Sequence, residues 1–272
     1  MIYVLGDPID FCYAYDYFIS ILTSGRNKIH FVISQEREKV SKWFERQKSQ
    51  YNNHRYLFLG DDYNITVEDP KNIFILNTKK LSDPVQKNKI ETYATKYKIV
   101  DYSLGNSQIV PSIYLPYQVN IMEIRNMPKS SHVCFVGNRS PNRDEVLNNP
   151  DLNVAIVNDW QRSRDLNLFQ YKILLNIHMD ESSKIHEEFR VNRCIMNKMI
   201  VVSEPSDNDE LLYLKEYIVF CPREQMVAKV HEILSDYENF HSQLFANFDI
   251  KTIQAHYKEK MTDALKSIIT IG

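Results

Sequence analysis

The sequence predicts an α/β protein with two doubly wound parallel sheets, one in each half of the chain. Short β-rich runs alternate with amphipathic stretches almost from end to end, which is the pattern of parallel strands joined by crossover helices. The length of 272 residues suits two domains of roughly 100–150 residues each. Because 43% of the residues are hydrophobic and 25% are charged, the chain has the composition of a globular protein with a sizeable core.

Three helical segments are expected between the strands of the first half. Pro84–Tyr97 is expected to be a helix because Asp83 stands at the N-cap and Pro84 at the first helical position. Ile9–Thr23 carries apolar residues at helical spacing, and Gln35–Gln47 is a charged amphipathic stretch. The expected strands are Ile2–Leu5, Ile29–Ile33, Tyr56–Leu59, Ile73–Leu76, Ile99–Asp101 and Ile113–Leu115.

The expected domain boundary lies where this alternation loosens, over residues 121–131. Pro128 lies in the irregular stretch, and a new strand is expected from His132. We therefore expect a Rossmann-like N-terminal domain over residues 1–126 and a Rossmann-like C-terminal domain over residues 127–272, facing each other across a cleft.

The second half repeats the organisation of the first. Its expected strands are Val133–Val136, Val154–Val157, Ile173–Asn176, Ile200–Ser203 and Ile218–Phe220. Its expected helices are Arg143–Asn148, Lys184–Asn197, Asp207–Leu214 and Arg223–Ser235. The segment Tyr237–Ile271 is expected to be helical and, having no strand to return to, to pack back on the N-terminal domain.

Charge and composition limit the partners and the compartment. A net charge of -2 and a pI near 6.5 leave no excess of Lys and Arg to neutralise nucleic-acid phosphates, so nucleic acid is not an expected partner. No stretch approaches the roughly 18 apolar residues of a membrane span, so no transmembrane segment is expected. The cysteines are scattered and are expected to be reduced thiols of a cytoplasmic protein. They are Cys12, Cys134, Cys194 and Cys221.

A glycine-containing turn follows the first expected strand of the second half. Ligands of open α/β sheets sit beyond the carboxyl ends of the strands, where this turn lies. Gly137 allows a close backbone approach, and Asn138 leads into a helix N-terminus whose amides attract phosphate. Arg139 and Arg143 add charge-assisted donors, so the turn is a candidate diphosphate site. A tight turn with solvated arginines is the alternative.

Two further strands end in polar residues. Lys172–His178 is a buried strand that delivers Asn176 and His178 to its carboxyl end, where a histidine can orient a hydroxyl or protonate a leaving phosphate. A histidine held by a loop carbonyl is the alternative. The strand ending in Ser203 and Glu204 follows a charged helix, and its carboxylate can accept from the hydroxyls of a ribose or from a base.

The charged helix before that strand carries Glu187, Arg190 and the pair Asn192–Arg193. These side chains can present one polar edge to a sugar and a phosphate. An ion pair between Glu187 and Arg190 on a solvated helix face is the alternative.

Together these segments resemble the donor-binding half of GT-B glycosyltransferases, specifically the glycosyl-transferase-group-1-like proteins of bacteria and large viruses. The segments that carry the resemblance, within Val133 to Leu234, are FVGNRSPNRDEVL, YKILLNIH and EEFRVNRCIMNKMIVVSE. The resemblance implies a GT-B fold and a nucleotide-sugar donor, UDP- or GDP-linked, held by the C-terminal domain. The donor-binding residues it implies are Gly137, Asn138, Arg139, Arg143, Asn176, Arg190, Ser203 and Glu204.

The sequence departs from the family pattern at two places. Arg193 stands where a glutamate usually binds the donor ribose, and Glu204 is the expected substitute. Asn197-Lys198 replaces the usual glycine after the helix, and Asn197 is expected to tolerate the left-handed conformation of that turn. The first half is similar more loosely. Its matching residues are Asn77-Thr78, Val100–Ser103, Asn106 and Tyr114–Tyr117.

The implied activity is sugar transfer to a hydroxyl of a glycan, protein or small-molecule acceptor. No metal and no other cofactor is expected, because backbone amides and arginines would offset the charge of the donor diphosphate. The predicted catalytic residues are Asp7, His178 and Glu187, with Asp10 and Asp101 as further candidates for the base.

Two other classes remain as alternatives. One is a catalytically silent GT-B-like protein that binds a nucleotide or glycan, which the arginine at position 193 favours. The other is a dinucleotide-dependent oxidoreductase, which the lack of a GxGxxG pattern at Gly6 and Gly137 disfavours.

Overall fold

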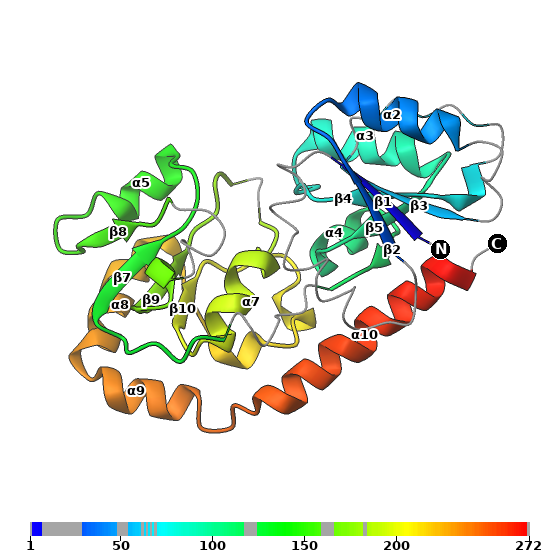
Figure 1. Cartoon of the computed structure of the whole chain (residues 1–272). Coiled ribbons are helices and arrows are strands. Elements are labelled where there is room, and N and C mark those ends of the chain that lie inside the picture. Colours follow the sequence, from blue (N-terminus) through cyan, green and yellow to red (C-terminus); the bar gives the residue numbers. More distant parts are fainter. Residues whose placement is uncertain are drawn as a thin grey trace. The chain divides into compact units, whose positions relative to one another are not determined.

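The computed structural model describes most of the chain and divides it into two compact units (Figure 1). One unit contains residues 1–118 and 254–272, and the other contains residues 119–253. The described residues are 2–6, 29–47, 54–60, 63, 65, 67, 70–116, 124–158, 166–181 and 184–270, the last two of these without their side chains. The expected helix Ile9–Thr23 lies outside the described residues.

The first unit contains a six-stranded parallel sheet in the order β2-β1-β3-β4-β5-β6. Its strands are β1 (Ile2–Gly6), β2 (Ile29–Ile33), β3 (Arg55–Leu59), β4 (Ile73–Asn77), β5 (Lys98–Asp101) and β6 (Ile113–Tyr114). All residues of β4 are buried, as expected of a central strand covered on both faces. The helices are α2 (Arg37–Arg46), α3 (Pro84–Ala94) and α4 (Leu104–Ile109), with a short 3-10 turn η2 (Pro70–Asn72).

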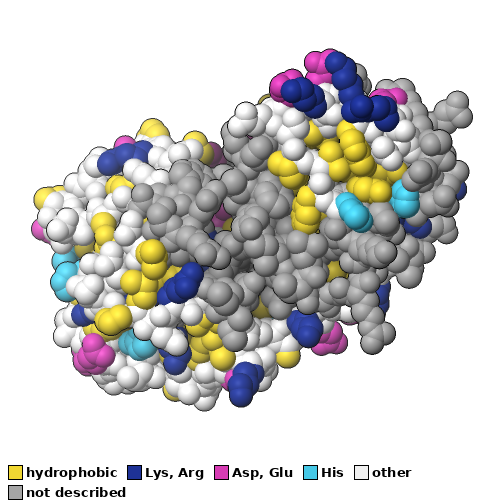
Figure 2. Space-filling model, in the orientation of Figure 1, with side chains coloured by type: hydrophobic (Ala, Val, Ile, Leu, Met, Phe, Trp, Pro, Cys, Tyr) yellow, Lys and Arg dark blue, Asp and Glu magenta, His cyan; other side chains and the backbone are white. Residues whose placement is uncertain are grey.

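Helices α2 and α3 share one apolar cluster with the sheet. Val40 and Phe44 of α2 and Ile90 of α3 pack with buried sheet residues that include Tyr56 and Phe58. The exposed side of α2 carries both signs of charge, with ion pairs of the i,i+3 and i,i+4 type (Figure 2). The helix is thus anchored by its apolar face, since exposed ion pairs add little stability.

The second unit contains a five-stranded parallel sheet in the order β11-β10-β9-β7-β8. Its strands are β7 (Ser131–Phe135), β8 (Val154–Ile156), β9 (Tyr171–Asn176), β10 (Ile200–Ser203) and β11 (Ile218–Phe220). Its helices are α5 (Pro141–Leu147), α7 (Glu188–Met196), α8 (Met226–Ser235) and α9 (Tyr237–Leu244), and α10 (Ile250–Thr270) runs from this unit into the first. The prediction of an α/β fold with two parallel sheets is confirmed.

Some predicted elements differ in the structure. The helix expected over Asp207–Leu214 is wrong, because only the 3-10 turn η4 (Asp209–Leu211) forms there. Two more 3-10 turns follow it, η5 (Lys215–Tyr217) before β11 and η6 (Arg223–Gln225) after β11. The Asp209 carboxylate accepts a hydrogen bond from the Ser206 amide at 2.5 Å, and such local side-chain bonds compete with a helix.

Two boundaries differ from expectation, and one helix is additional. The helix expected from Lys184 begins only at Glu188, and the C-terminal helical segment is broken between α9 and α10. Helix α4 was not expected; its N-cap Ser103 accepts from the Asn106 amide at 3.4 Å. Among the described helices, none combines the length and the apolar character needed to cross a membrane.

Candidate functional site

The turn after β7 brings the backbone close to two arginines. Gly137 has φ +138°, a conformation that side chains rarely adopt. A Cβ atom at this position would lie 3.0 Å from Nη1 of Arg190 and 3.4 Å from the ring of Phe135. Glycine is therefore required here both for the backbone conformation and for the space that the arginine side chain takes.

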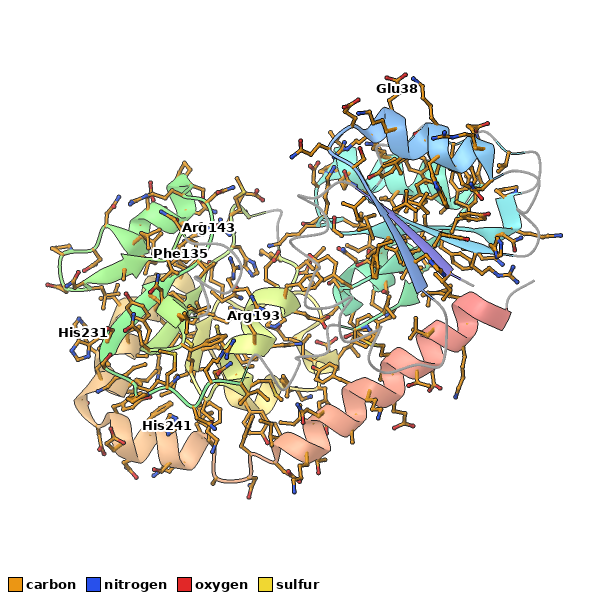
Figure 3. The ribbon with its side chains drawn as sticks, viewed as in Figure 1. Glu38, Phe135, Arg143, Arg193, His231 and His241 are labelled. Carbon is orange, nitrogen blue, oxygen red and sulfur yellow. The ribbon has the colours of Figure 1, made fainter. Side chains whose placement is uncertain are left out.

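Arg143 points from α5 back toward the sheet. Only 5% of the residue is exposed. Its Nε donates to the carbonyl of Ile177 at 3.0 Å, and its Nη1 donates to the carbonyl of Asn138 at 2.6 Å. The guanidinium lies 5.2 Å from the ring centroid of Phe135 (Figure 3). Burial, and then the nearby charge of Arg190, lower the pKa of Arg143 to about 10, so it stays charged at neutral pH.

Arg190 of α7 reaches the same ring from the other element. Its Nη1 donates to the carbonyl of Val136 at 2.6 Å, and its Nη2 donates to Oδ1 of Asn176 at 2.7 Å. Its guanidinium lies 5.8 Å from the ring centroid of Phe135. Its Nε is buried and has no hydrogen-bond partner among the described residues.

These contacts place two guanidiniums beside Gly137, and the carboxylates of Glu187, Glu204 and Asp180 are near enough to raise the pKa of Arg143 in part. The hydrogen bonds of Arg143 and Arg190 go to backbone carbonyls and an amide, which carry no charge. Two like charges placed at one aromatic ring repel each other, and an anion brought to this spot relieves that repulsion. The arrangement suits a phosphate group.

A buried hydrogen-bond chain connects the ends of β9 and β10. Asn176 donates through Nδ2 to the hydroxyl of Ser203 at 2.8 Å, and that hydroxyl donates to the carbonyl of Glu204 at 2.8 Å. Asn176 is 1% exposed and Ser203 is fully buried. The chain therefore fixes the orientation of the Asn176 amide, whose oxygen in turn holds Arg190.

His178 and Glu204 lie just beyond the carboxyl ends of β9 and β10 and contact each other. The amide of His178 donates to Oε2 of Glu204 at 2.5 Å, and Nε2 of His178 lies 3.0 Å from the carbonyl of Pro205. A hydrogen bond to that carbonyl places the proton of a neutral imidazole on Nε2. Burial raises the pKa of Glu204, while the amide of His178 and the charge of Arg223 oppose the rise.

Arg223 contacts three carboxylates that come from separate segments. Its Nε donates to Glu145 at 2.9 Å and its Nη2 donates to Glu181 at 2.8 Å, while its Nη1 lies 3.4 Å from Oε1 of Glu204. Hydrogen bonding to Glu181 raises the pKa of Arg223. Our sequence analysis did not identify Arg223, although it closely follows the carboxyl end of β11 and the rule applied to the other strands could have found it.

A pocket of 230 Å³ opens beside this group, within the second unit. It is lined by His178, Asp180, Glu181, Lys184, Glu204, Pro205, Pro222, Arg223 and Glu224. These residues follow the carboxyl ends of β9, β10 and β11, where open α/β sheets bind ligands.

The remaining expected site residues lie as follows. Arg139 is half-exposed. It forms an ion pair with Asp144 at 2.7 Å and a hydrogen bond with Asn148, so its guanidinium is bound to the adjacent helix α5 and its C-cap. Glu187 stands at the N-cap position of α7, and its carbonyl accepts from the Arg190 amide at 3.0 Å. Asn138 contributes its carbonyl to Arg143. Asp7 and Asp10 lie outside the described residues.

The turn after α7 forms differently from expectation. Lys198 adopts the left-handed conformation, with φ +52°, whereas Asn197 has φ -95°. The prediction that Asn197 supplies the left-handed residue is wrong, because its side chain is used as a cap. Its Nδ2 donates to the carbonyl of Arg193 at 2.9 Å, and its Oδ1 accepts from the Arg125 amide at 2.8 Å.

The first unit has a polar cluster at the carboxyl ends of β4 and β5. Asp101 is fully buried and accepts from Nδ2 of Asn77 at 2.7 Å, from Nδ2 of Asn106 at 3.0 Å and from the Ser103 amide at 2.9 Å. A base must reach the proton that it removes, and a carboxylate held in this way does not reach solvent. The arrangement argues against Asp101 as the catalytic base and gives it a structural role.

Comparison with solved structures defines the class of fold. Two parallel sheets with their covering helices, one sheet in each unit, constitute the GT-B fold of glycosyltransferases. T4 phage BGT in complex with UDP and Mn²⁺ aligns with a TM-score of 0.58 and 12% identity, covering 99% of this chain and 100% of that one. A BGT mutant in complex with UDP-glucose aligns with a TM-score of 0.57 and 13% identity, with the same coverage.

Sequence relatives are found in Acanthamoeba polyphaga mimivirus. The uncharacterized protein L140 is 32% identical over 200 residues, which are 67% of this chain and 66% of L140. The uncharacterized protein L138 is 31% identical over 202 residues, which are 67% of this chain but 23% of L138. The chain thus spans less than two thirds of these relatives. No protein-family model matches the chain.

Proposed function

We propose that the chain is a glycosyltransferase that moves a sugar from a nucleoside-diphosphate donor to an acceptor hydroxyl. The observation that carries this proposal is the pair of guanidiniums at the ring of Phe135, held by neutral acceptors beside a glycine with φ +138°. Nε of Arg190, which has no acceptor within the part of the chain that the structure describes, adds to it, because buried N–H groups are rarely left without one. The GT-B fold gives this site its context.

The arginine pair suits the charge that develops during transfer. The bond between the anomeric carbon and the phosphate oxygen breaks, and its electron pair stays on the leaving diphosphate. Arg143 and Arg190 stabilise that charge, and hydrogen bonds to Ile177 and Asn176 hold their guanidiniums in place. The acceptor oxygen forms the new bond to the anomeric carbon, and a base accepts the proton that the acceptor hydroxyl loses.

His178, Glu187 and Asp7 remain our proposed catalytic residues. Nε2 of His178 lies 3.0 Å from the carbonyl of Pro205, and the residue is 5% exposed. The resemblance to the family implies that His178 orients a hydroxyl of the donor. The roles of Glu187 as a sugar contact and of Asp7 as the base rest on the resemblance to the family.

We propose that transfer requires no metal ion. Among the described residues, no group of three His, Cys, Asp or Glu side chains is placed to hold one. Asp207-Asn208-Asp209 has the spacing of a metal-binding carboxylate pair, but Oδ2 of Asp209 accepts from the Ser206 amide, and no third His, Cys, Asp or Glu among the described residues completes a group with them. Turnover should therefore persist in EDTA, and a strict requirement for Mn²⁺ would contradict this part of the proposal.

The test of the proposed activity is turnover of activated sugars by the full chain. The protein is incubated with UDP-, GDP-, CMP- and dTDP-sugars, and release of the free nucleotide is measured with and without added glycans. Release above the rate of spontaneous hydrolysis supports a transferase.

A catalytically silent nucleotide-binding protein is the second candidate. It is favoured by Arg193, which stands where the family places a ribose-binding glutamate and is 4% exposed in α7. Tight nucleotide binding without any release of product would support this candidate over the enzyme.

A further inference from the structure

The pocket beside Glu204 differs in charge from the arginine pair at Gly137. Its lining contains four carboxylates, from Asp180, Glu181, Glu204 and Glu224, against the two cations Lys184 and Arg223. A phosphate group in this lining would face an excess of negative charge. The pocket is therefore suited to a part of the donor that is uncharged and rich in hydrogen-bond donors.

The size of the pocket limits which part of the donor enters it. A volume of 230 Å³ is smaller than the roughly 300–1,000 Å³ that encloses a whole drug-sized ligand. One ring system fits this space, whereas a complete nucleotide sugar does not. With the diphosphate at the arginine pair, the base is the natural occupant.

Glu204 and Arg223, which both line the pocket, present an acceptor and a donor next to each other. Oε2 of Glu204 accepts from the His178 amide at 2.5 Å, whereas Oε1 has only the long 3.4 Å contact with Arg223. Oε1 therefore keeps acceptor capacity. Arg223 lies next to it and directs one N–H each at Glu145, Glu181 and Glu204, which leaves two of its five N–H groups for a ligand. The wall offers a carboxylate acceptor and a guanidinium donor side by side.

From this pairing, and resting on the proposed function, we infer that the donor carries guanine. Guanine presents two adjacent donors, N1–H and N2–H, which match a carboxylate, next to O6, which together with N7 matches an arginine. Uracil presents a single N–H between two carbonyl oxygens, so it offers the carboxylate one donor fewer than guanine does. Glu204 is then the residue that determines base specificity, with Arg223 beside it.

Titration calorimetry of the unmodified full chain tests this inference with GDP, UDP and inosine diphosphate. The three ligands share the ribose and the diphosphate, and inosine diphosphate is GDP without the 2-amino group. GDP is expected to bind about tenfold more tightly than either of the others, because an unpaired buried acceptor is costly. Equal affinities, or a preference for UDP, would overturn the assignment of guanine.

A matched pair of variants locates the specificity. Glu204→Gln keeps the shape and an acceptor for the His178 amide, and is expected to reduce the preference for GDP over UDP to about twofold or less. Glu145→Gln removes another carboxylate from Arg223 but lies outside the pocket lining, and is expected to keep the preference. If Glu204→Gln does not fold, the comparison of GDP with inosine diphosphate decides alone.

The outcomes separate this inference from the proposed function. Absence of binding by every nucleoside diphosphate would overturn both. Binding of all three with similar affinity would leave the diphosphate site intact and remove only the base assignment.

Discussion

Both units place polar side chains at the carboxyl ends of their central strands, yet the two groups differ in how fully they are satisfied. In the first unit, the Asp101 carboxylate is surrounded by amide donors from Asn77 and Asn106 and by a backbone N–H. In the second unit, Arg143 and Arg190 face one ring, and no described residue accepts from Nε of Arg190. The same topological position therefore serves structure where its bonds are complete and suits binding where a charge is left over.

The largest expected effect is on the satisfied cluster. Among the described residues, Asp101→Ala removes one of the two acceptors of each amide of Asn77 and Asn106, which keep only the carbonyl of Lys79, and the acceptor of the Ser103 amide; it should lower the free energy of unfolding by about 3 kcal/mol. Urea unfolding measures the loss. Nucleotide affinity of the remaining folded protein should be unchanged, and a selective loss of affinity without destabilisation would reverse the assignment of this cluster to structure.

The next effect is on the arginine pair. Arg190→Ala should weaken the binding of a nucleoside diphosphate by about 10- to 100-fold, since it removes a charge-assisted donor worth about 1.5–3 kcal/mol. Arg139→Ala is the matched control, because this arginine lies on the turn after β7 but is paired with Asp144. Calorimetric titration measures the affinity of both variants for the nucleoside diphosphate. An equal loss of affinity in the two would show that only the net charge of the protein matters.

A smaller effect is expected from Gly137→Ala. The alanine backbone must adopt φ +138°, and its Cβ atom lies 3.0 Å from Nη1 of Arg190. The variant should therefore lose about 2 kcal/mol of stability along with nucleotide affinity. Gly105→Ala within α4 serves as the control and should stabilise by up to about 1 kcal/mol. Thermal unfolding of the two variants, measured in parallel, shows whether the melting temperature falls in Gly137→Ala and rises in Gly105→Ala.

The smallest effect is a pH dependence near the pocket. Burial raises the pKa of Asp209 from 3.8 to about 6, so between these values the folded chain binds more protons than the unfolded chain. Stability from this group is present at low pH and is lost as the pH rises from about 4 to about 6, by about 1 kcal/mol after allowance for partial exposure. Asp209→Asn should flatten this part of the profile in urea unfolding.

The fold was predictable because its strands are strongly apolar and its helices carry local signals. β4 is buried throughout, and Asp83 caps α3 by accepting from the Val85 amide at 2.9 Å, as expected from the sequence. The segment Asp207–Leu214 was mispredicted because the local bond between Asp209 and Ser206 is not visible in a hydrophobic pattern.

The site was less predictable, because arginines that look alike in sequence have different surroundings. Arg139 precedes the cap of α5 and turns to its own helix, whereas Arg143 lies in the first turn and faces the sheet. The position of Arg223 after β11 could have been noticed in the sequence, but its three partners could not, since they come from separate segments. Long-range pairing of this kind leaves no local pattern.

Phe135 holds two cations through its ring and carries no titratable group. The charge that Arg143 presents to an anion therefore persists across the physiological range, since its pKa is about 10. Ions in solution weaken the attraction, because they screen the guanidiniums and compete for them. How long a spent nucleotide stays on the protein would then follow ionic strength, so salt would accelerate product departure.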